Sequence, residues 1–178
     1  NGTVIVGNAG LNVKNASQTF AGQITGTGGL NVEGGTLTLT GASNFTNGLG
    51  ISNGATVKIG AGGTSGSITS NVTNFGTLIF DRSDDISYAG QISGQGMVIK
   101  TGANTATFTG AISGTQLNVE QGTAVLLGTI NSNAYVADQA KLVFARPTAT
   151  TYRGVLSGTG SVVKSGVGTT TFSGNSSG

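Results

Sequence analysis

Apolar and polar residues alternate along most of this chain. In segments 36–40 and 105–109, Leu, Ala or Phe fall on one face and threonines fall on the other. A period of two predicts short strands with one buried face. The same pattern predicts strands at 3–6, 11–13, 30–32, 55–59, 77–80, 123–127, 141–144 and 169–172. Gly-Thr-Gly, Asn-Gly and Gly-Gly turns separate these strands, and no helical period is long enough to supply crossover helices, so we expect an all-β fold.

A long internal repeat organises the strands. The segment Phe-Ala-Gly-Gln-Ile-Thr-Gly-Thr-Gly, which begins at Phe20, returns in related form from Tyr88 and again from Tyr152. We therefore predict a single β-helical repeat segment over 1–178. Its repeat units are expected at about 20–87 and 88–151, with an incomplete third unit at 152–178.

The repeat length indicates how the strands are arranged. Strands this short, joined by short turns, fit a sandwich, a barrel or a solenoid. Units of about 64 to 68 residues divide into three coils of about 21 to 23 residues, which is the scale of one β-solenoid turn, so the sequence predicts a rod of about eight coils. Equivalent apolar residues are expected to stack in the same columns of this rod.

Composition narrows the possible chemistry. The 178 residues include no His and no Cys, which excludes imidazole bases, thiol nucleophiles, disulfides and zinc sites built on these residues. Charged residues make up 8% of the chain and the formal net charge is +2. This charge is too dilute for a nucleic-acid partner, which needs a concentrated basic face. We expect no cofactor and no catalytic residue.

One copy of the repeat resembles a known family. Residues 156–174 read Leu-Ser-Gly-Thr-Gly-Ser-Val-Val-Lys-Ser-Gly-Val-Gly-Thr-Thr-Thr-Phe-Ser-Gly. This string resembles the passenger-associated repeat of bacterial type V autotransporters. Residues 84–110 resemble that repeat nearly as closely, whereas in 20–41 Val32-Glu33-Gly34 replaces the Lys-Ser-Gly step.

The resemblance carries several implications. It implies a right-handed parallel β-helix that is exported across the outer membrane and is displayed on, or released from, the surface of a Gram-negative bacterium. It also implies that the chain is a piece of a larger passenger, attached to an outer-membrane β-barrel outside this chain. In that family such repeats form a stalk and aid secretion.

The densest acidic segment contains Asp81, Asp84 and Asp85. These three carboxylates, close together in sequence, are a candidate for a Ca²⁺ site or for the acid pair of a glycan hydrolase. The equivalent segment of the next unit keeps Arg146 and has none of the acids. A solvated corner loop is therefore the favoured interpretation.

Basic and aromatic residues also recur at equivalent positions. Arg82 matches Arg146, and Lys100 matches Lys164. They predict either a stacked contact ladder for anionic glycans or lipopolysaccharide, or a repeated structural position that caps carbonyl groups. The aromatic residues that open the three units, Phe20, Tyr88 and Tyr152, are expected to pack in the core; a sugar-stacking stripe is the alternative.

These observations favour a structural and adhesive surface stalk. It would support cell–cell or host-cell adhesion, including autoaggregation and biofilm formation linked to virulence, and it would also support secretion. The candidate partners are a second copy of the chain or a glycan or protein of the host surface. The alternatives are a β-helical polysaccharide-degrading enzyme and a spacer that assists translocation and binds no ligand.

Overall fold

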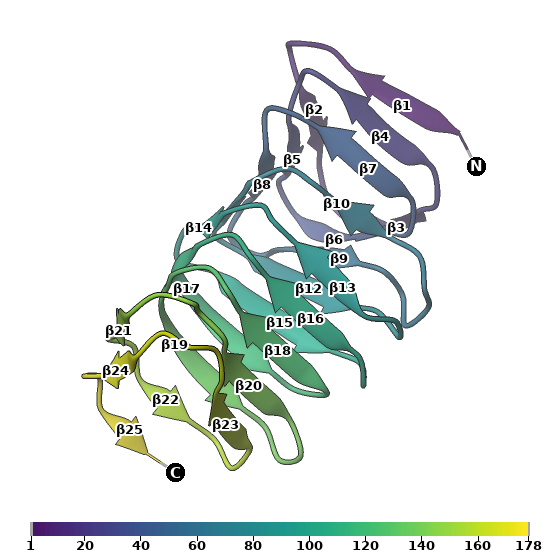
Figure 1. The fold of residues 1–178 in the computed structure, drawn as a ribbon. Coiled ribbons are helices and arrows are strands. Elements are labelled where there is room, and N and C mark those ends of the chain that lie inside the picture. Colours follow the sequence, from purple (N-terminus) through teal and green to yellow (C-terminus); the bar gives the residue numbers. More distant parts are fainter. Residues whose placement is uncertain (1, 178) are drawn as a thin grey trace.

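The computed structural model describes residues 2–177; Asn1 and Gly178, which the predicted range 1–178 includes, lie outside the described residues. Over 2–177 the chain consists of short strands and turns without a helix. The strands stack in parallel as a β-solenoid of about eight turns (Figure 1). This arrangement confirms the all-β solenoid expected from the sequence.

The chain visits three sides of the solenoid in turn. Side 1 consists of β1 (Thr3–Val6), β4 (Gln23–Gly26), β7 (Ala42–Phe45), β10 (Ser67–Ile68), β13 (Ile86–Tyr88), β16 (Thr105–Phe108), β18 (Thr123–Leu126), β20 (Lys141–Phe144) and β23 (Ser161–Lys164). Side 2 consists of β2 (Leu11–Val13), β5 (Leu30–Val32), β8 (Leu49–Ile51), β11 (Val72–Asn74), β14 (Ile92–Ser93), β21 (Thr150–Tyr152) and β24 (Thr170–Phe172). Side 3 consists of β3 (Ala16–Phe20), β6 (Gly35–Leu39), β9 (Ala55–Ile59), β12 (Thr77–Asp81), β15 (Met97–Thr101), β22 (Leu156–Ser157) and β25 (Ser176–Ser177).

Two longer strands join side 2 to side 3. β17 (Ile112–Val119) and β19 (Ile130–Val136) begin on side 2 and run around the corner onto side 3. Their mutual register shifts between Ser113 and Gln116, at this corner. Because of these strands, sides 2 and 3 form one 14-stranded sheet, except for β21 and β24, which pair with each other in a separate two-stranded sheet.

Successive turns lie in close register. Leu11 and Leu30 are partners in neighbouring strands, and the same spacing of 19 positions separates the hydrogen-bonded Asn12 and Asn31 beside them. The longest turn lies between the partners Ala42 and Ser67, because it includes the loop 60–66. Apart from this turn, most turns resemble the one between Leu11 and Leu30. They are somewhat shorter than the length of about 21 to 23 residues expected from the repeat.

The inward residues form one continuous apolar core. On side 2 the inward column consists of Leu11, Leu30, Leu49, Val72, Ile92, Ile112 and Ile130. The members from Leu30 to Ile130 are at most 5% exposed. Each such side chain stabilises the fold by roughly 1.5–3 kcal/mol when it leaves water, and each is covered by the turns above and below it.

The sequence repeat does not match a whole number of turns. Three turns of register partners lead from Phe20 to Phe80 on side 3. Tyr88, the repeat equivalent of Phe20, lies one strand further along, on side 1. Likewise, three turns lead from Tyr88 to Phe144, and Tyr152 lies one strand beyond, on side 2.

Each repeat unit thus spans three turns and one additional side. The expectation that equivalent residues stack in the same column is wrong. One turn takes about 20 residues, so a unit of about 64 to 68 residues exceeds three turns by one strand and its corner. Equivalent residues of successive units consequently lie on different sides of the rod.

Candidate functional site

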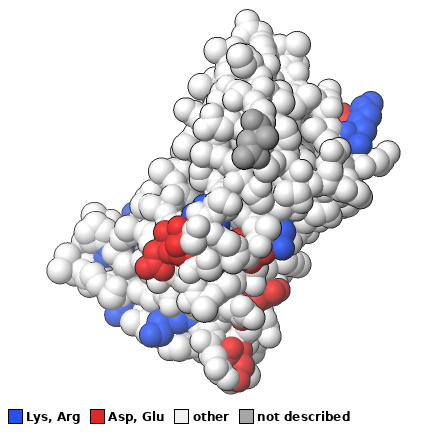
Figure 2. Space-filling model, turned by 90° about the vertical axis from the view of Figure 1, so that its right-hand side faces the viewer, with Lys and Arg blue, Asp and Glu red and all other residues white. Residues whose placement is uncertain are grey.

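The outer surface of the solenoid carries few charges. On the face shown in Figure 2, Lys, Arg, Asp and Glu side chains are scattered, and most of the surface belongs to other residues. The outward row of side 2 consists of Asn12, Asn31, Gly50 and Thr73, which are register partners in successive turns. This row offers hydrogen-bond donors and acceptors but little electrostatic attraction.

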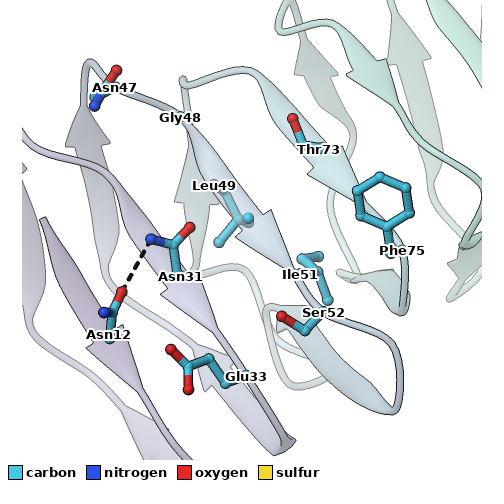
Figure 3. Close-up of a pocket in the computed structure, with 11 residues that line it drawn as sticks. Asn12, Asn31, Glu33, Asn47, Gly48, Leu49, Ile51, Ser52, Thr73 and Phe75 are labelled. Carbon is cyan, nitrogen blue, oxygen red and sulfur yellow. Dashed lines mark hydrogen bonds between the residues drawn. The ribbon is translucent and has the colours of Figure 1, made fainter.

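A groove interrupts the outward row of side 2. Asn31 Nδ2 donates a hydrogen bond to Asn12 Oδ1 at 3.0 Å. Gly50, the next member of the row, has no side chain to continue it. The resulting Asn31 groove has a volume of about 480 Å³ (Figure 3), and its outward lining includes Asn12, Asn31, Glu33, Asn47, Ser52, Thr73 and Phe75.

Phe75 forms one wall of the Asn31 groove. Its backbone N–H donates to the Ile51 carbonyl at 2.8 Å, which fixes the corner after β11. The residue is 53% exposed. Its equivalent in the next repeat unit is Gln139, so the repeat does not preserve an aromatic ring at this position.

The long repeat gives no indication of the Asn31 groove. The available signal was the spacing of Asn12 and Asn31, because this spacing of 19 positions equals one turn. A second signal was Phe75, an aromatic residue that lies between the strands and is not repeated.

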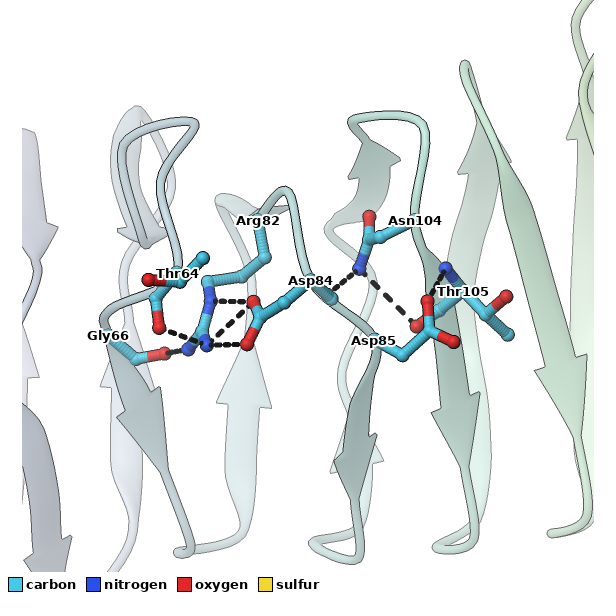
Figure 4. Close-up of polar contacts among 7 residues, drawn as sticks. All are labelled: Thr64, Gly66, Arg82, Asp84, Asp85, Asn104 and Thr105. Carbon is cyan, nitrogen blue, oxygen red and sulfur yellow. Dashed lines mark hydrogen bonds and ion pairs between the residues drawn. The ribbon is translucent and has the colours of Figure 1, made fainter.

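The acidic segment does not bring its three carboxylates together. Asp81 pairs with Lys58 at 2.6 Å, whereas both oxygens of Asp84 accept hydrogen bonds from Arg82 at 2.8 Å. Asp85 accepts a hydrogen bond from the Thr105 backbone N–H at 2.7 Å (Figure 4). Within residues 2–177, no group of three acidic, His or Cys side chains is arranged to hold a metal ion.

Arg82 fastens the loop 60–66 to the solenoid. The residue is 8% exposed, and its guanidinium donates to the carbonyl groups of Thr64, at 2.5 Å, and Gly66. Asp84 compensates the arginine charge from the other direction (Figure 4). Hydrogen bonds of this kind between a charged donor and fixed acceptors define the conformation of a glycine-rich loop.

Arg146 has an arrangement parallel to that of Arg82. It donates to Thr129 Oγ1 in the preceding turn at 2.7 Å and to Thr148 Oγ1 two residues ahead at 3.4 Å. Arg82 likewise contacts the preceding turn and the residue two positions ahead. Both arginines thus connect neighbouring turns.

The two matched lysines make similar contacts with different burial. Lys100 Nζ donates to the carbonyl groups of Thr101 at 3.0 Å, Gly102 at 2.6 Å and Gln121 at 3.1 Å, and the residue is fully buried. Burial lowers the pKa of Lys100 to about 8, although the carboxylates of Asp81 and Asp85 oppose this shift.

Lys164 caps the carbonyl groups of the two residues that follow it, Ser165 at 2.6 Å and Gly166 at 2.8 Å, but it is exposed. The register partner of Lys164 is Phe144 on side 1, whereas Lys100 lies between Phe80 and Val119 on side 3. The predicted stacking of the basic residues in one ladder is therefore wrong. It fails for the same reason as the apolar columns, because each repeat adds one side.

The aromatic residues that open the second and third units belong to the core. Tyr88 and Tyr152 are 4% and 2% exposed, and their hydroxyls donate to the carbonyl groups of Ser70 at 2.6 Å and Ser132 at 2.8 Å. Burial raises the pKa of both hydroxyls, that of Tyr152 to about 12. The core interpretation is confirmed for these two residues, and Phe20 is half-buried against the same core.

A glycine makes room for each tyrosine hydroxyl. A Cβ at Gly154 would lie 2.0 Å from the Ser132 carbonyl oxygen and 2.6 Å from the Tyr152 hydroxyl. Gly90 has the same relation to Ser70 and Tyr88. Both distances are far shorter than van der Waals contact, so the repeated Tyr-x-Gly spacing has a steric cause.

Comparison with known proteins gives one informative match. A 42-residue segment is 52% identical to the adhesin BmaC autotransporter of Brucella suis biovar 1 (strain 1330). The match covers 24% of this chain and 1% of that protein, so the chain spans only a small part of its relative. No family model matches the chain, and no solved structure matches it significantly. No helix within residues 2–177 is long and apolar enough to cross a membrane. The matched segment and the parallel β-solenoid both fit the repeat region of an autotransporter passenger.

Proposed function

We propose that this chain is an adhesive stalk segment of an autotransporter passenger, displayed on or released from a Gram-negative cell. The observation that carries this proposal is the 52% identical match to an adhesin of that class. The solenoid supports it, because about eight turns spaced by roughly 4.8 Å make a rod of roughly 40 Å. Such a rod holds a distal region away from the cell surface.

The outer rows supply the adhesive contacts. Outward Asn, Thr and Ser side chains recur once per turn, as Asn12 and Asn31 do on side 2. An amide both donates and accepts hydrogen bonds, so such rows pair with a second rod or with a host surface. The low net charge of +2 leaves little repulsion between two copies.

A spacer that assists translocation is the second candidate. The parallel register between neighbouring turns favours it, because each turn that folds presents a template for the next. The enzyme alternative receives less support. The match is to an adhesin, and the carboxylates of Asp81, Asp84 and Asp85 are directed to separate partners.

The test is an in-frame deletion of this segment from the full-length protein on a bacterial surface. Surface level is measured by antibody, together with bacterial aggregation and host-cell binding. Unchanged display with lost adhesion supports the adhesive stalk. Unchanged display with unchanged adhesion contradicts it, and lost display supports the translocation role.

A further inference from the structure

We propose that Phe75 and the Asn31 groove form a binding site for a neutral oligosaccharide. This inference rests on the proposed adhesive function and deepens it by naming the chemistry of one partner.

The aromatic ring is the apolar surface that the groove offers to a ligand. Phe75 is 53% exposed, whereas Leu49 and Ile51, which also line the groove, are 1% exposed. An exposed phenyl ring has no polar tip that water could solvate, so covering it is favourable. The C–H face of a pyranose ring covers a phenyl ring by stacking, and the hydroxyl groups at its edge remain available to the surrounding polar residues.

The polar lining matches the hydroxyl groups of a sugar. After the Asn31–Asn12 hydrogen bond forms, Asn31 retains one amide hydrogen and its carbonyl oxygen. Ser52 and Thr73 add exposed hydroxyls that both donate and accept. Because sugar hydroxyls also donate and accept, this mixed lining suits a polyol better than it suits an ion.

The charge of the groove favours a neutral ligand. Glu33 is its one ionisable lining residue, and Lys14 lies 3.6 Å from the Glu33 carboxylate. A sulfated or uronic acid sugar would face Glu33 with no cation in the lining to compensate. A neutral sugar can instead donate hydrogen bonds to that carboxylate.

A second groove indicates that the ligand is longer than one sugar. Phe75 also lines the Gln95 groove, which has a volume of about 420 Å³ and whose lining includes Asn53, Gln95, Met97 and Gln116. The ring therefore stands between two amide-lined hollows. A chain of several sugars can stack one unit on Phe75 and place its neighbours in the two grooves.

A protein partner fits this surface less well. A stable protein interface usually has an apolar centre and buries about 800 Å² on each partner. In the Asn31 groove Phe75 is the one apolar residue with a large exposed fraction. The surroundings are amides, hydroxyls, backbone and the carboxylate of Glu33.

The experiment is a titration of the ¹⁵N-labelled chain, followed by NMR and calorimetry. The probes are neutral gluco-, galacto-, manno- and N-acetylglucosamine oligosaccharides of four to six units, with sulfated oligosaccharides as the comparison. We expect saturable binding of a neutral oligosaccharide that shifts the side-chain amide resonances of Asn12 and Asn31.

Three variants assign the binding to the groove. Phe75→Ala removes the stacking surface and should weaken binding about tenfold. Gly50→Asn fills the groove, since a Cβ at this position would lie 2.4 Å from Asn31 Oδ1, and should abolish binding. Tyr135→Ala removes an aromatic side chain that is 38% exposed on side 3 and lines neither groove, and should leave binding unchanged. Circular dichroism verifies that all three variants remain folded.

Several outcomes would overturn the proposal. They are the absence of binding to every neutral oligosaccharide in the panel, binding of sulfated oligosaccharides alone, and wild-type affinity in Phe75→Ala. A further outcome concerns adhesion by whole bacteria. If adhesion is lost on deletion of the segment but retained in Phe75→Ala, and a protein receptor is captured instead, the sugar site in the groove is refuted. The proposed adhesive function then still stands. If deletion leaves adhesion unchanged, the proposed function fails, and the titration alone decides whether the groove binds sugar.

Discussion

Lys100 should make the stability of this protein rise with pH in the alkaline range. Its ammonium group is fully buried on side 3, and its pKa falls from 10.5 to about 8. A lysine in the unfolded chain keeps the higher value. Below pH 8 both states bind the proton, and the folded state bears the full cost of holding a charge in the core. Between pH 8 and 10.5 the folded state releases the proton first, so this cost is progressively relieved.

The magnitude follows from the difference between the two pKa values. A shift of one unit corresponds to about 1.4 kcal/mol, so the full effect is about 3 kcal/mol. About 2 kcal/mol of this appears between pH 7 and 10. With an m value of about 2 kcal/mol/M in urea, the midpoint of unfolding should rise by about 1 M over that interval.

The assay is urea unfolding followed by circular dichroism from pH 7 to 10, with Lys100→Met as the matched control. The chain has no His or Cys side chain to titrate in this range. The methionine variant keeps much of the side-chain volume and lacks the titrating group, so the difference between the two proteins isolates Lys100. If both proteins show the same pH dependence, or if the wild-type midpoint falls relative to the variant, the reasoning about this buried ammonium is refuted.

Three further substitutions test the connections between turns. Tyr152→Phe removes the hydroxyl that donates to the Ser132 carbonyl and should cost about 1 kcal/mol, which calorimetry would detect as a fall in Tm of roughly 3 °C; an unchanged Tm would contradict the importance of this hydrogen bond. Gly154→Ala places a Cβ 2.0 Å from the Ser132 carbonyl oxygen and should destabilise the fold by about 2–3 kcal/mol in the same assay. The control is Gly63→Ala, whose Cβ would have no atom within 4 Å, and it should change stability by less than about 0.5 kcal/mol. Arg82→Met should release the loop 60–66 and expose it to cleavage by proteinase K. Arg146 does not contact that loop, so Arg146→Met should leave the loop resistant. Equal cleavage of the two variants would argue against the role of Arg82 in fastening the loop.

The strands were predictable because their pattern is local. The alternation at 3–6, 11–13 and 30–32 corresponds to β1, β2 and β5. Each of these segments needs only one buried face, and a period of two records that requirement directly. Their stacking as a solenoid followed from the length of the repeat, and the parallel arrangement was what the family resemblance implied.

The rotational relation between units was not predictable from the repeat alone. Aligning Phe20 with Tyr88 gives the length of a unit, but it does not give the length of a turn. The length of a turn depends on how much chain each corner takes, and the corners differ, as the loop 60–66 shows. The spacing of Asn12 and Asn31 was the sequence feature that reports one turn directly.

The environment of Lys100 illustrates what a period-two pattern omits. The alternation of β15 places Val98 and Lys100 on the same inward face, but a long lysine stem can carry its charge back to water. In the folded chain the carbonyl groups of Thr101, Gly102 and Gln121 surround the ammonium instead. Gln121 comes from the next turn, so this environment arises only after the turns have stacked.

The extra side in each repeat gives the rod a screw symmetry. A passenger built from further units of this length would rotate each unit by a third of a circle relative to the one before. A given surface feature would return to its original direction only after three units, or about ten turns, which is roughly 50 Å along the axis. Where two straight rods lie side by side, equivalent positions would then contact the neighbouring rod only at widely spaced points. Sites of one kind would project outward around the whole circumference. Such a stalk would be accessible to partners from every direction.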